Sequence, residues 1–310
     1  MKKKCVVMLS GGLDSRLAVK IMQEQGFEVT ALFFNIPFGS GCCDENCSFN
    51  FSQLQGVKLK VINCSKGKLL KEYLDILKKP KYGRGSGINP CIDCRIFMFE
   101  QARRFADEEG IDLIVTGEVL GERPMSQMRK AMKIIESESG LQGRLLRPLS
   151  AKLLPETKAE KKGLVNRKKL YDIQGRRRNI QIKLAKKFKI RYPHPAGGCL
   201  LCEKELINRF KVLLERGLNE SEIKFVNVGR HFIIDECWVV IGRNKKENEI
   251  IESLGNVSKK RVIVPDFPAP SAVVMDKCGK TTKEKVNELI KTYSKKGNLK
   301  NRMNFDKYKM

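Results

Sequence analysis

The chain has 310 residues, of which 41% are hydrophobic, so it can bury the cores of two domains, and we expect a folded rather than a disordered chain. Lys and Arg number 61 against 35 Asp and Glu, and the formal net charge of +26 favours nucleic acid as a partner over a merely solvated surface. We find no apolar span of about 20 residues, no lipidation signal and no cleavable leader, so we expect a cytoplasmic protein with no membrane partner.

Short apolar runs alternate with helical patterns in the first half of the chain. We predict strands at 3–9, 28–34, 59–63 and 111–117, with helices between them at 17–25, 68–79 and 95–110. Because strands separated by helices pair in parallel, this alternation predicts an α/β fold. The expected architecture is a doubly wound parallel sheet with helices on both faces, over about residues 4 to 150.

The second half of the chain changes in composition. Residues 152–190 are strongly basic and largely helical in pattern, and they lead into the loop YPHPAGGCLLC at 192–202. Beyond this loop we predict a helix at 206–217, strands at 225–235 and 237–243, a helix at 247–254, and then a lysine-rich, mobile tail. We therefore expect a catalytic domain at 1–203 and a smaller basic α+β domain at 204–310.

The first predicted strand runs into Ser10-Gly11-Gly12-Leu13-Asp14-Ser15, directly before a helix. Backbone N–H groups at a helix start, two of them from glycines, form a nest for an anion. Ser10 and Ser15 can donate hydrogen bonds to phosphate oxygens, and Asp14 suits a Mg²⁺ ligand on that phosphate. A plain Gly-Gly turn would explain the glycines but not the whole set of six residues.

The segment SGGLDS resembles the PP-loop of the N-type ATP pyrophosphatases, which cleave ATP between its α and β phosphates and commonly adenylate a carbonyl oxygen. This resemblance implies that ATP and Mg²⁺ bind at the turn. It also implies that the ends of two further strands, 33–35 and 116–118, lie beside the nucleotide. The implied contacts are Ser10, Gly11, Gly12, Asp14 and Ser15 with the pyrophosphate and Mg²⁺, and Phe34, Thr116 and Gly117 with the nucleotide.

Eleven cysteines include two Cys-x-x-Cys pairs, CIDC at 91–94 and CLLC at 199–202. The first pair opens a helical pattern, and a positive helix end together with Arg95 would lower a thiol pKa and favour thiolate. The spacing by itself leaves a structural Zn²⁺ site and a catalytic use equally open. We interpret the isolated cysteines as small buried residues; these are Cys5, Cys64, Cys237 and Cys278.

The segment NPCIDC resembles the NPxxxC motif of tRNA 2-thiouridylases, and residues 1–203 resemble a thiouridylase-related group of PP-loop proteins. The resemblance puts Cys94 and Cys199 at the positions of two catalytic cysteines. Those enzymes usually have an acid/base Asp directly after Asn-Pro, where this chain has Cys91, and Asp93 follows as a substitute. The exchange resembles the [4Fe–4S] site of iron–sulfur-dependent tRNA thiolases, with ligands Cys91, Cys94 and Cys199 and a possible fourth at Cys202.

The resemblance therefore implies an ATP-dependent tRNA sulfurtransferase that adenylates a uridine oxygen, at C2 or C4, for replacement by sulfur. Sulfide or a cysteine desulfurase would supply the sulfur, which is held on the cluster or as a persulfide on Cys199 with Cys94 as resolving thiol. Two alternatives stay open: a PP-loop amidotransferase or ligase, and a catalytically silent, metal-stapled RNA-binding protein. For the segment CCDENC at 42–47 we weigh a further metal site and a sulfur relay.

Basic residues from 175 onward favour RNA binding. The segment GRRRNIQIKLAKKFK places cations on one amphipathic helix, and we expect RNA phosphates to contact Arg176, Arg177, Arg178 and Lys183. Residues 227–254 resemble the RNA-binding module at the end of ribosome-quality-control factors, with a stabilising cap on the catalytic domain as the alternative. His194 and His231 are expected to pack or to form hydrogen bonds, not to bind a metal.

Overall fold

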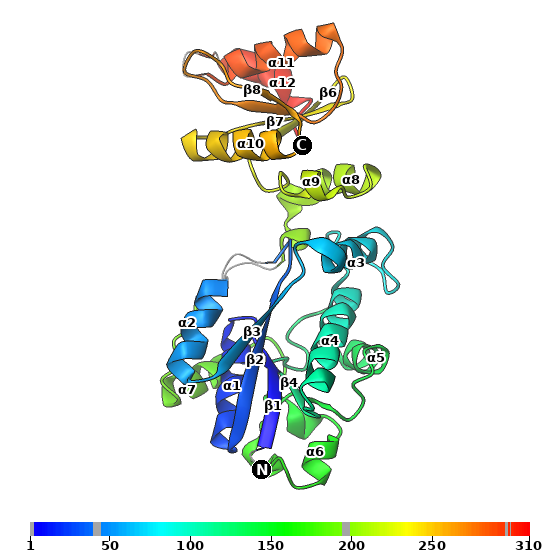
Figure 1. Cartoon of the computed structure of the whole chain (residues 1–310), viewed down its shortest axis with the longest axis vertical. Coiled ribbons are helices and arrows are strands. Elements are labelled where there is room, and N and C mark those ends of the chain that lie inside the picture. Colours follow the sequence, from blue (N-terminus) through cyan, green and yellow to red (C-terminus); the bar gives the residue numbers. More distant parts are fainter. Residues whose placement is uncertain (1–2, 40–44, 194–198, 295–296, 298) are drawn as a thin grey trace. The chain divides into compact units, whose positions relative to one another are not determined.

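The computed structural model describes residues 3–39, 45–193, 199–294, 297 and 299–310, with only the backbone at 299–301. The chain forms two compact units, Met1–Cys202 and Glu203–Met310, each described by itself (Figure 1). No helix within these described ranges is long and apolar enough to cross a membrane.

Unit 1 contains a five-stranded parallel sheet in the order β3-β2-β1-β4-β5. Its strands are β1 (Lys3–Met8), β2 (Phe27–Asn35), β3 (Lys58–Asn63), β4 (Ile114–Thr116) and β5 (Leu145–Leu146). The strand order reverses between β1 and β4, and open α/β sheets bind their ligands at such a reversal, beyond the carboxyl ends of the strands. The predicted parallel sheet is confirmed, whereas β5 is too short for its sequence pattern to predict it.

Helices cover both faces of this sheet (Figure 1). On one face, Cys5 and Val7 of β1 pack with α1 (Leu13–Glu24), α2 (Glu45–Gln55) and α7 (Asn179–Lys187). On the other face, Val6 and Met8 pack with α4 (Cys91–Glu108) and α5 (Arg129–Glu138). Successive side chains of a strand point to opposite faces, so one apolar strand joins two cores.

The basic stretch 152–190 is mostly irregular, and the helical pattern expected there was wrong for most of its length. Before α7 it contains only three short helices: η1 (Ala151–Leu153), α6 (Lys158–Lys161) and η2 (Arg167–Lys169). Val165, Leu170 and Ile173 are buried in the core beside α1, while the two lysines between them, Lys168 and Lys169, are exposed. The apolar residues thus dock an irregular chain on the core instead of forming a helical stripe.

Unit 2 contains a four-stranded antiparallel sheet in the order β6-β7-β9-β8. Its strands are β6 (Arg230–Ile234), β7 (Cys237–Ile241), β8 (Arg261–Ile263) and β9 (Ala272–Val274). The predicted strand pair is confirmed as the β6–β7 hairpin, and the predicted helices are α8 (Ile207–Glu215) and α10 (Lys245–Val257). A short helix, α9 (Glu220–Ile223), follows α8.

Two expectations for unit 2 were wrong. The lysine-rich end is not a tail, because α11 (Lys280–Thr292) and α12 (Leu299–Asp306) contribute Leu289, Ile290 and Phe305 to the core. Cys237 and Cys278 are not isolated residues but form a disulfide. Antiparallel pairing of β7 with β9 brings these cysteines together from distant parts of the sequence. Cys5 and Cys64 are fully buried, as predicted.

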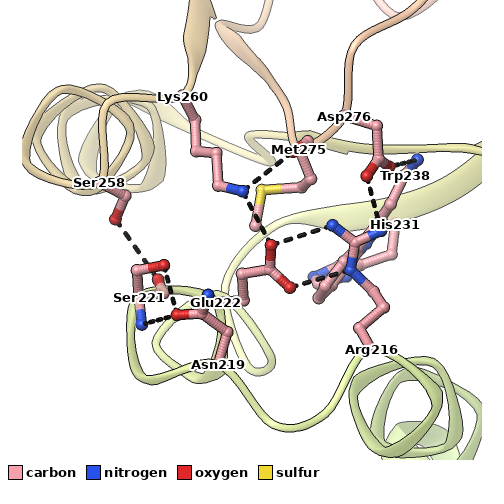
Figure 2. Close-up of polar contacts among 10 residues, drawn as sticks. All are labelled: Arg216, Asn219, Ser221, Glu222, His231, Trp238, Ser258, Lys260, Met275 and Asp276. Atoms are coloured by element: carbon pink, nitrogen blue, oxygen red, sulfur yellow. Dashed lines mark hydrogen bonds and ion pairs between the residues drawn. The ribbon is translucent and has the colours of Figure 1, made fainter.

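A network of charged side chains ties α8 and α9 to the sheet of unit 2 (Figure 2). Glu222 is buried and accepts hydrogen bonds from Arg216 Nε and Nη2, both at 2.9 Å, and from Lys260 Nζ at 2.8 Å. Arg216 also donates to Asp276 at 2.6 Å and lies over the Trp238 ring. A buried charge is costly unless it is paired, so this network fixes where the two helices lie.

Candidate functional site

The segment SGGLDS forms the turn between β1 and α1. Gly11 has a φ of +77°, which favours glycine, and Gly12 is the N-cap of α1 without a side-chain cap. Side chains therefore leave the first N–H groups of α1 uncapped, as an anion site at a helix start requires. The Ser10 and Ser15 hydroxyls lie 3.3 Å apart beside this turn.

The end of β4 comes close to the same turn. A Cβ at Gly117 would lie 2.4 Å from the Asp14 carbonyl carbon and from the Ser15 nitrogen, so the position has room only for glycine. Thr116 is buried, and its hydroxyl accepts the Glu118 N–H at 2.9 Å. Phe34 lies near the end of β2 and packs against the core on the face of the sheet that α4 and α5 cover. The residues predicted for nucleotide contact thus share the carboxyl edge of the sheet.

Arg16 is a residue of this turn that the sequence analysis missed. It is 6% exposed, and its Nε donates to the Gly11 carbonyl at 2.7 Å. Its other nitrogens reach the Arg191 carbonyl and the Cys47 sulfur, and its guanidinium lies over the Phe51 ring. Arg16 therefore holds the glycine turn in place. In the sequence, its position directly after the SGGLDS motif was the one indication of this role.

Burial and two neighbouring charged side chains act on the Asp14 carboxylate. Burial and then the nearby Glu122 raise the pKa of Asp14, Arg178 opposes both effects, and the net result is a pKa of about 6. Arg178 Nη2 lies 3.9 Å from Asp14 Oδ2, and Arg178 Nε donates to Glu122 at 2.9 Å. Arg178 thus lies in the PP-loop region, while the other three residues predicted for RNA contact, Arg176, Arg177 and Lys183, are exposed.

We expected the three arginines to share one helix with the lysines, and this expectation was wrong. Arg178 is the N-cap of α7, Arg176 and Arg177 precede it, and Lys183 lies within the helix.

The two Cys-x-x-Cys pairs lie side by side in unit 1. Cys91 is the first residue of α4, and the loop before it pairs with the second motif through a hydrogen bond from Ile88 N to Leu201 O at 3.0 Å. A Cβ at Gly87 would lie 2.3 Å from the same carbonyl oxygen, so this contact needs glycine. The fold therefore joins two motifs that stand far apart in the sequence.

Each of three thiols has its own polar neighbour. Asn89 Nδ2 donates to Cys91 at 3.0 Å, the Cys94 thiol lies 3.9 Å from the Tyr73 hydroxyl, and the Cys199 thiol donates to the Phe38 carbonyl at 3.1 Å. Tyr73 is fully buried on α3 (Gly67–Lys78) and interacts electrostatically with all three thiols. From the sequence, Tyr73 could be recognised only as one residue on the apolar face of the helix predicted at 68–79.

Burial makes two of these thiols, Cys94 and Cys199, poor acids. It raises the pKa of Cys94 to about 11, although Arg95 opposes the shift, and it raises the pKa of Cys199 to about 12. The expected lowering of the thiol pKa was therefore wrong for Cys94, because desolvation outweighs the positive charge nearby. Both groups are neutral thiols at pH 7 in this conformation.

Asp93 is engaged by the loop that precedes α4. Its two oxygens accept the backbone N–H groups of Lys81, at 2.8 Å, and Tyr82, at 3.1 Å. Such paired bonds make a carboxylate an organiser of a loop.

Among the residues that the structure describes, there is no group of three or more His, Cys, Asp or Glu side chains that could hold a metal ion. Thiolates are the ligands that iron–sulfur clusters and zinc prefer, so Cys91, Cys94 and Cys199 have suitable chemistry although they are not grouped as a metal site here. Cys202 follows at the end of η3 (Leu200–Cys202) and is half-buried. Cys42, Cys43 and His194 lie outside the described residues, whereas Cys47 lies in α2.

Comparison with known families gives a match of residues 1–160 to the model described as thiamine biosynthesis protein (ThiI). The chain belongs to the ThiI family. This membership confirms the predicted kinship with PP-loop proteins of tRNA thiolation. Beyond the ThiI match, residues 229–308 match the model described as NFACT protein RNA binding domain.

Curated relatives are proteins named tRNA-specific 2-thiouridylase MnmA. The one from Sulfurimonas denitrificans is 30% identical over 123 residues, which cover 38% of this chain and 35% of that protein. The one from Acetivibrio thermocellus is 33% identical over 129 residues, which cover 37% and 35%. This ThiI-family chain thus spans about a third of the length of the curated relatives that it matches.

Similar solved structures share less sequence. A 4-thiouridine synthetase in complex with RNA and bound ATP is 21% identical, with a TM-score of 0.38, over 69% of this chain and 53% of that one. A predicted subunit of tRNA methyltransferase from Methanocaldococcus jannaschii is 18% identical, with a TM-score of 0.33, over 47% and 69%.

Proposed function

We propose that this chain is an ATP-dependent tRNA sulfurtransferase. The observation that carries the proposal is the pairing of Ile88 with Leu201, which puts the two Cys-x-x-Cys motifs side by side in the unit that contains the PP-loop. The helix α4 precedes β4, so its first residue, Cys91, lies toward the carboxyl edge of the sheet, where the PP-loop also lies. The name of the matched relatives, tRNA-specific 2-thiouridylase, agrees with this chemistry.

The proposed reaction begins at the PP-loop turn. The N–H groups at the start of α1 and the Ser10 and Ser15 hydroxyls bind the phosphates of ATP, and Asp14 would hold Mg²⁺, which neutralises phosphate charge. A uridine carbonyl oxygen attacks the α phosphate and releases pyrophosphate. Sulfur then attacks the activated carbon, and the former carbonyl oxygen leaves with AMP. Activation is required because an amide-like oxygen is a poor leaving group.

The cysteine set would deliver the sulfur. Cys91, Cys94 and Cys199 would hold a [4Fe–4S] cluster, which supplies an open iron for hydrosulfide, with Cys202 as a reserve ligand. In the iron-free form of the proposal, a cysteine desulfurase would transfer sulfane sulfur to Cys199 as a persulfide, whose outer sulfur attacks the activated carbon and expels AMP. Cys94 thiolate then attacks the Cys199 sulfur, which breaks the S–S bond, releases the thiouridine and leaves a Cys94–Cys199 disulfide for an external thiol to reduce. The neutral thiols of this conformation must lose their protons in either form. The ligase alternative gives no reason for joining the two motifs.

Two features support tRNA as the partner. Arg176, Arg177 and Lys183 are exposed at the start and along α7. Residues 229–308 match an RNA-binding domain family, and they belong to a chain with a formal net charge of +26. Unit 2 then binds RNA while unit 1 performs the chemistry.

The test uses the full chain purified without oxygen, with Mg·ATP, sulfide and unmodified tRNA, and analyses digested nucleosides by mass spectrometry. We expect a thiouridine that requires ATP and that Cys94→Ala abolishes, whereas Cys5→Ala, a buried cysteine of the other core, retains it. Production of AMP without thionucleoside would refute sulfur transfer from sulfide, and the same result with a cysteine desulfurase and cysteine as donor would refute the persulfide form. Production of neither would favour the silent RNA-binding alternative. Iron content and visible absorbance distinguish the cluster from the persulfide.

A further inference from the structure

Two carboxylates and one guanidinium meet at the PP-loop turn. Asp14 lies in the first turn of α1, Glu122 in the loop after β4, and Arg178 at the N-cap of α7. Arg178 donates to Glu122 at 2.9 Å and lies 3.9 Å from Asp14. A hydrogen bond from Gly175 N to Leu120 O, at 2.7 Å, holds the segments of Arg178 and Glu122 together. Three separate parts of the chain thus converge on one charged group.

Unpaired polar atoms surround the same carboxylate. Asp14 Oδ1 is buried and has no hydrogen-bond partner among the described residues, and the same is true of both amide atoms of Gln181. Gln181 is fully buried on α7 and lies close enough to act on the Asp14 carboxylate, although neither of its amide atoms reaches hydrogen-bond geometry with it. Because buried polar atoms are normally hydrogen-bonded, these orphaned atoms indicate that a polar ligand binds at this point.

We propose that Glu122 and Asp14 together form the divalent-cation site of bound Mg·ATP, and that Arg178 is the counter-ion of this pair until the metal enters. The inference rests on the proposed use of ATP at the PP-loop. Mg²⁺ is commonly bound by one or two carboxylates together with substrate phosphates. Two protein ligands therefore suffice, because phosphate oxygens and water would complete the coordination.

The proposal gives Arg178 a role different from RNA contact. The guanidinium supplies the positive charge that two buried carboxylates need, since neighbouring like charges destabilise each other without a counter-ion. Glu122 is only 7% exposed, so it cannot rely on water for this compensation. A metal ion bound to both carboxylates must compete with Arg178 for them.

The experiment titrates the full chain with Mn²⁺ as the probe and measures free Mn²⁺ by electron paramagnetic resonance, with and without α,β-methylene-ATP. Removal of the competing cation in Arg178→Gln should raise the Mn²⁺ affinity about fivefold. Loss of a ligand in Glu122→Gln should lower it about tenfold. Arg178→Lys should restore competition, and the matched controls Arg104→Gln and Glu109→Gln, both at exposed positions, should equal the wild type.

Each outcome decides the proposal. Unchanged affinity in Glu122→Gln, or a lower affinity in Arg178→Gln, overturns it and leaves the contact as a structural ion pair. Wild-type binding of the analogue with no response of Mn²⁺ to either variant keeps the proposed function and refutes this inference. Mn²⁺ binding that responds as expected, without any binding of the analogue, refutes ATP use and keeps the carboxylate pair. If Glu122→Gln does not fold, Glu122→Asp should bind Mn²⁺ more weakly than the wild type.

Discussion

Asp93 is 7% exposed, and both of its oxygens accept backbone N–H groups from the loop before α4. A side chain that satisfies two backbone donors contributes to the position of that loop. The loop includes Gly87 and Ile88, which contact the segment of Cys199 through Leu201. At the residue scale, Asp93 therefore influences the cysteine pairs through geometry, whether or not it also transfers a proton.

We expect Asp93→Asn to lower the free energy of unfolding by about 1–3 kcal/mol, because the new amide NH₂ group faces a backbone donor and leaves it unsatisfied. Denaturant titration of the full chain measures the change. Asp112→Asn, at an exposed position, serves as the control and should stay within about 0.5 kcal/mol of the wild type. Unchanged stability of Asp93→Asn combined with lost thiolation would instead indicate an acid/base role.

At the scale of elements, the β6–β7 hairpin contains a fully buried histidine. His231 Nδ1 accepts from the Trp238 indole at 3.0 Å, and its Nε2 donates to the Val228 carbonyl at 2.8 Å, which defines the neutral ring. The predicted hydrogen-bonding role of His231 is thus confirmed. Burial, followed by the positive charge of Arg209, lowers the pKa of His231 to about 3.

The hairpin should therefore lose stability in acid. Below pH 6.5 the unfolded chain binds a proton on His231 that the folded chain excludes, so stability falls as the pH decreases from about 6.5 toward 3, by at most about 1.4 kcal/mol per pH unit. In the His194→Asn variant, which retains one histidine, NMR of the ring should show no titration down to about pH 4. A midpoint near 6.5 would contradict the prediction.

At the scale of the whole molecule, the net charge predicts RNA binding that weakens steeply with salt. Arg176 and Arg177 are exposed, whereas Arg178 is paired with Glu122. The double variant Arg176→Gln/Arg177→Gln should reduce the slope of log affinity against log salt by about 1.5, at roughly 0.7–0.9 per lost phosphate contact. Binding of the full chain to tRNA at several salt concentrations measures the slope. Arg178→Gln is the matched comparison, and an equal reduction by it would contradict the distinction.

Local sequence patterns predicted much of the fold and the PP-loop half of the candidate site. The apolar run of β1 followed by SGGLDS predicted a strand, a tight turn and a helix start, because glycine conformation and strand periodicity act over a few neighbouring residues. The hairpin of unit 2 was predicted for the same reason. The patterns failed where an irregular segment packs on the core through single apolar residues, as at Val165 and Leu170. The spacing of such residues follows the surface that they cover, so it has neither helical nor strand periodicity.

The sequence by itself determined that this chain has a PP-loop, parallel strands to present it and two Cys-x-x-Cys motifs. Only the tertiary structure decided that these motifs meet, that Cys237 pairs with Cys278, and that Arg178 lies against Asp14 and Glu122. It also reversed the expected acidity of Cys94. The physical reason is common to all of these results: desolvation and long-range contacts depend on which distant segments cover a side chain, and no local pattern records that.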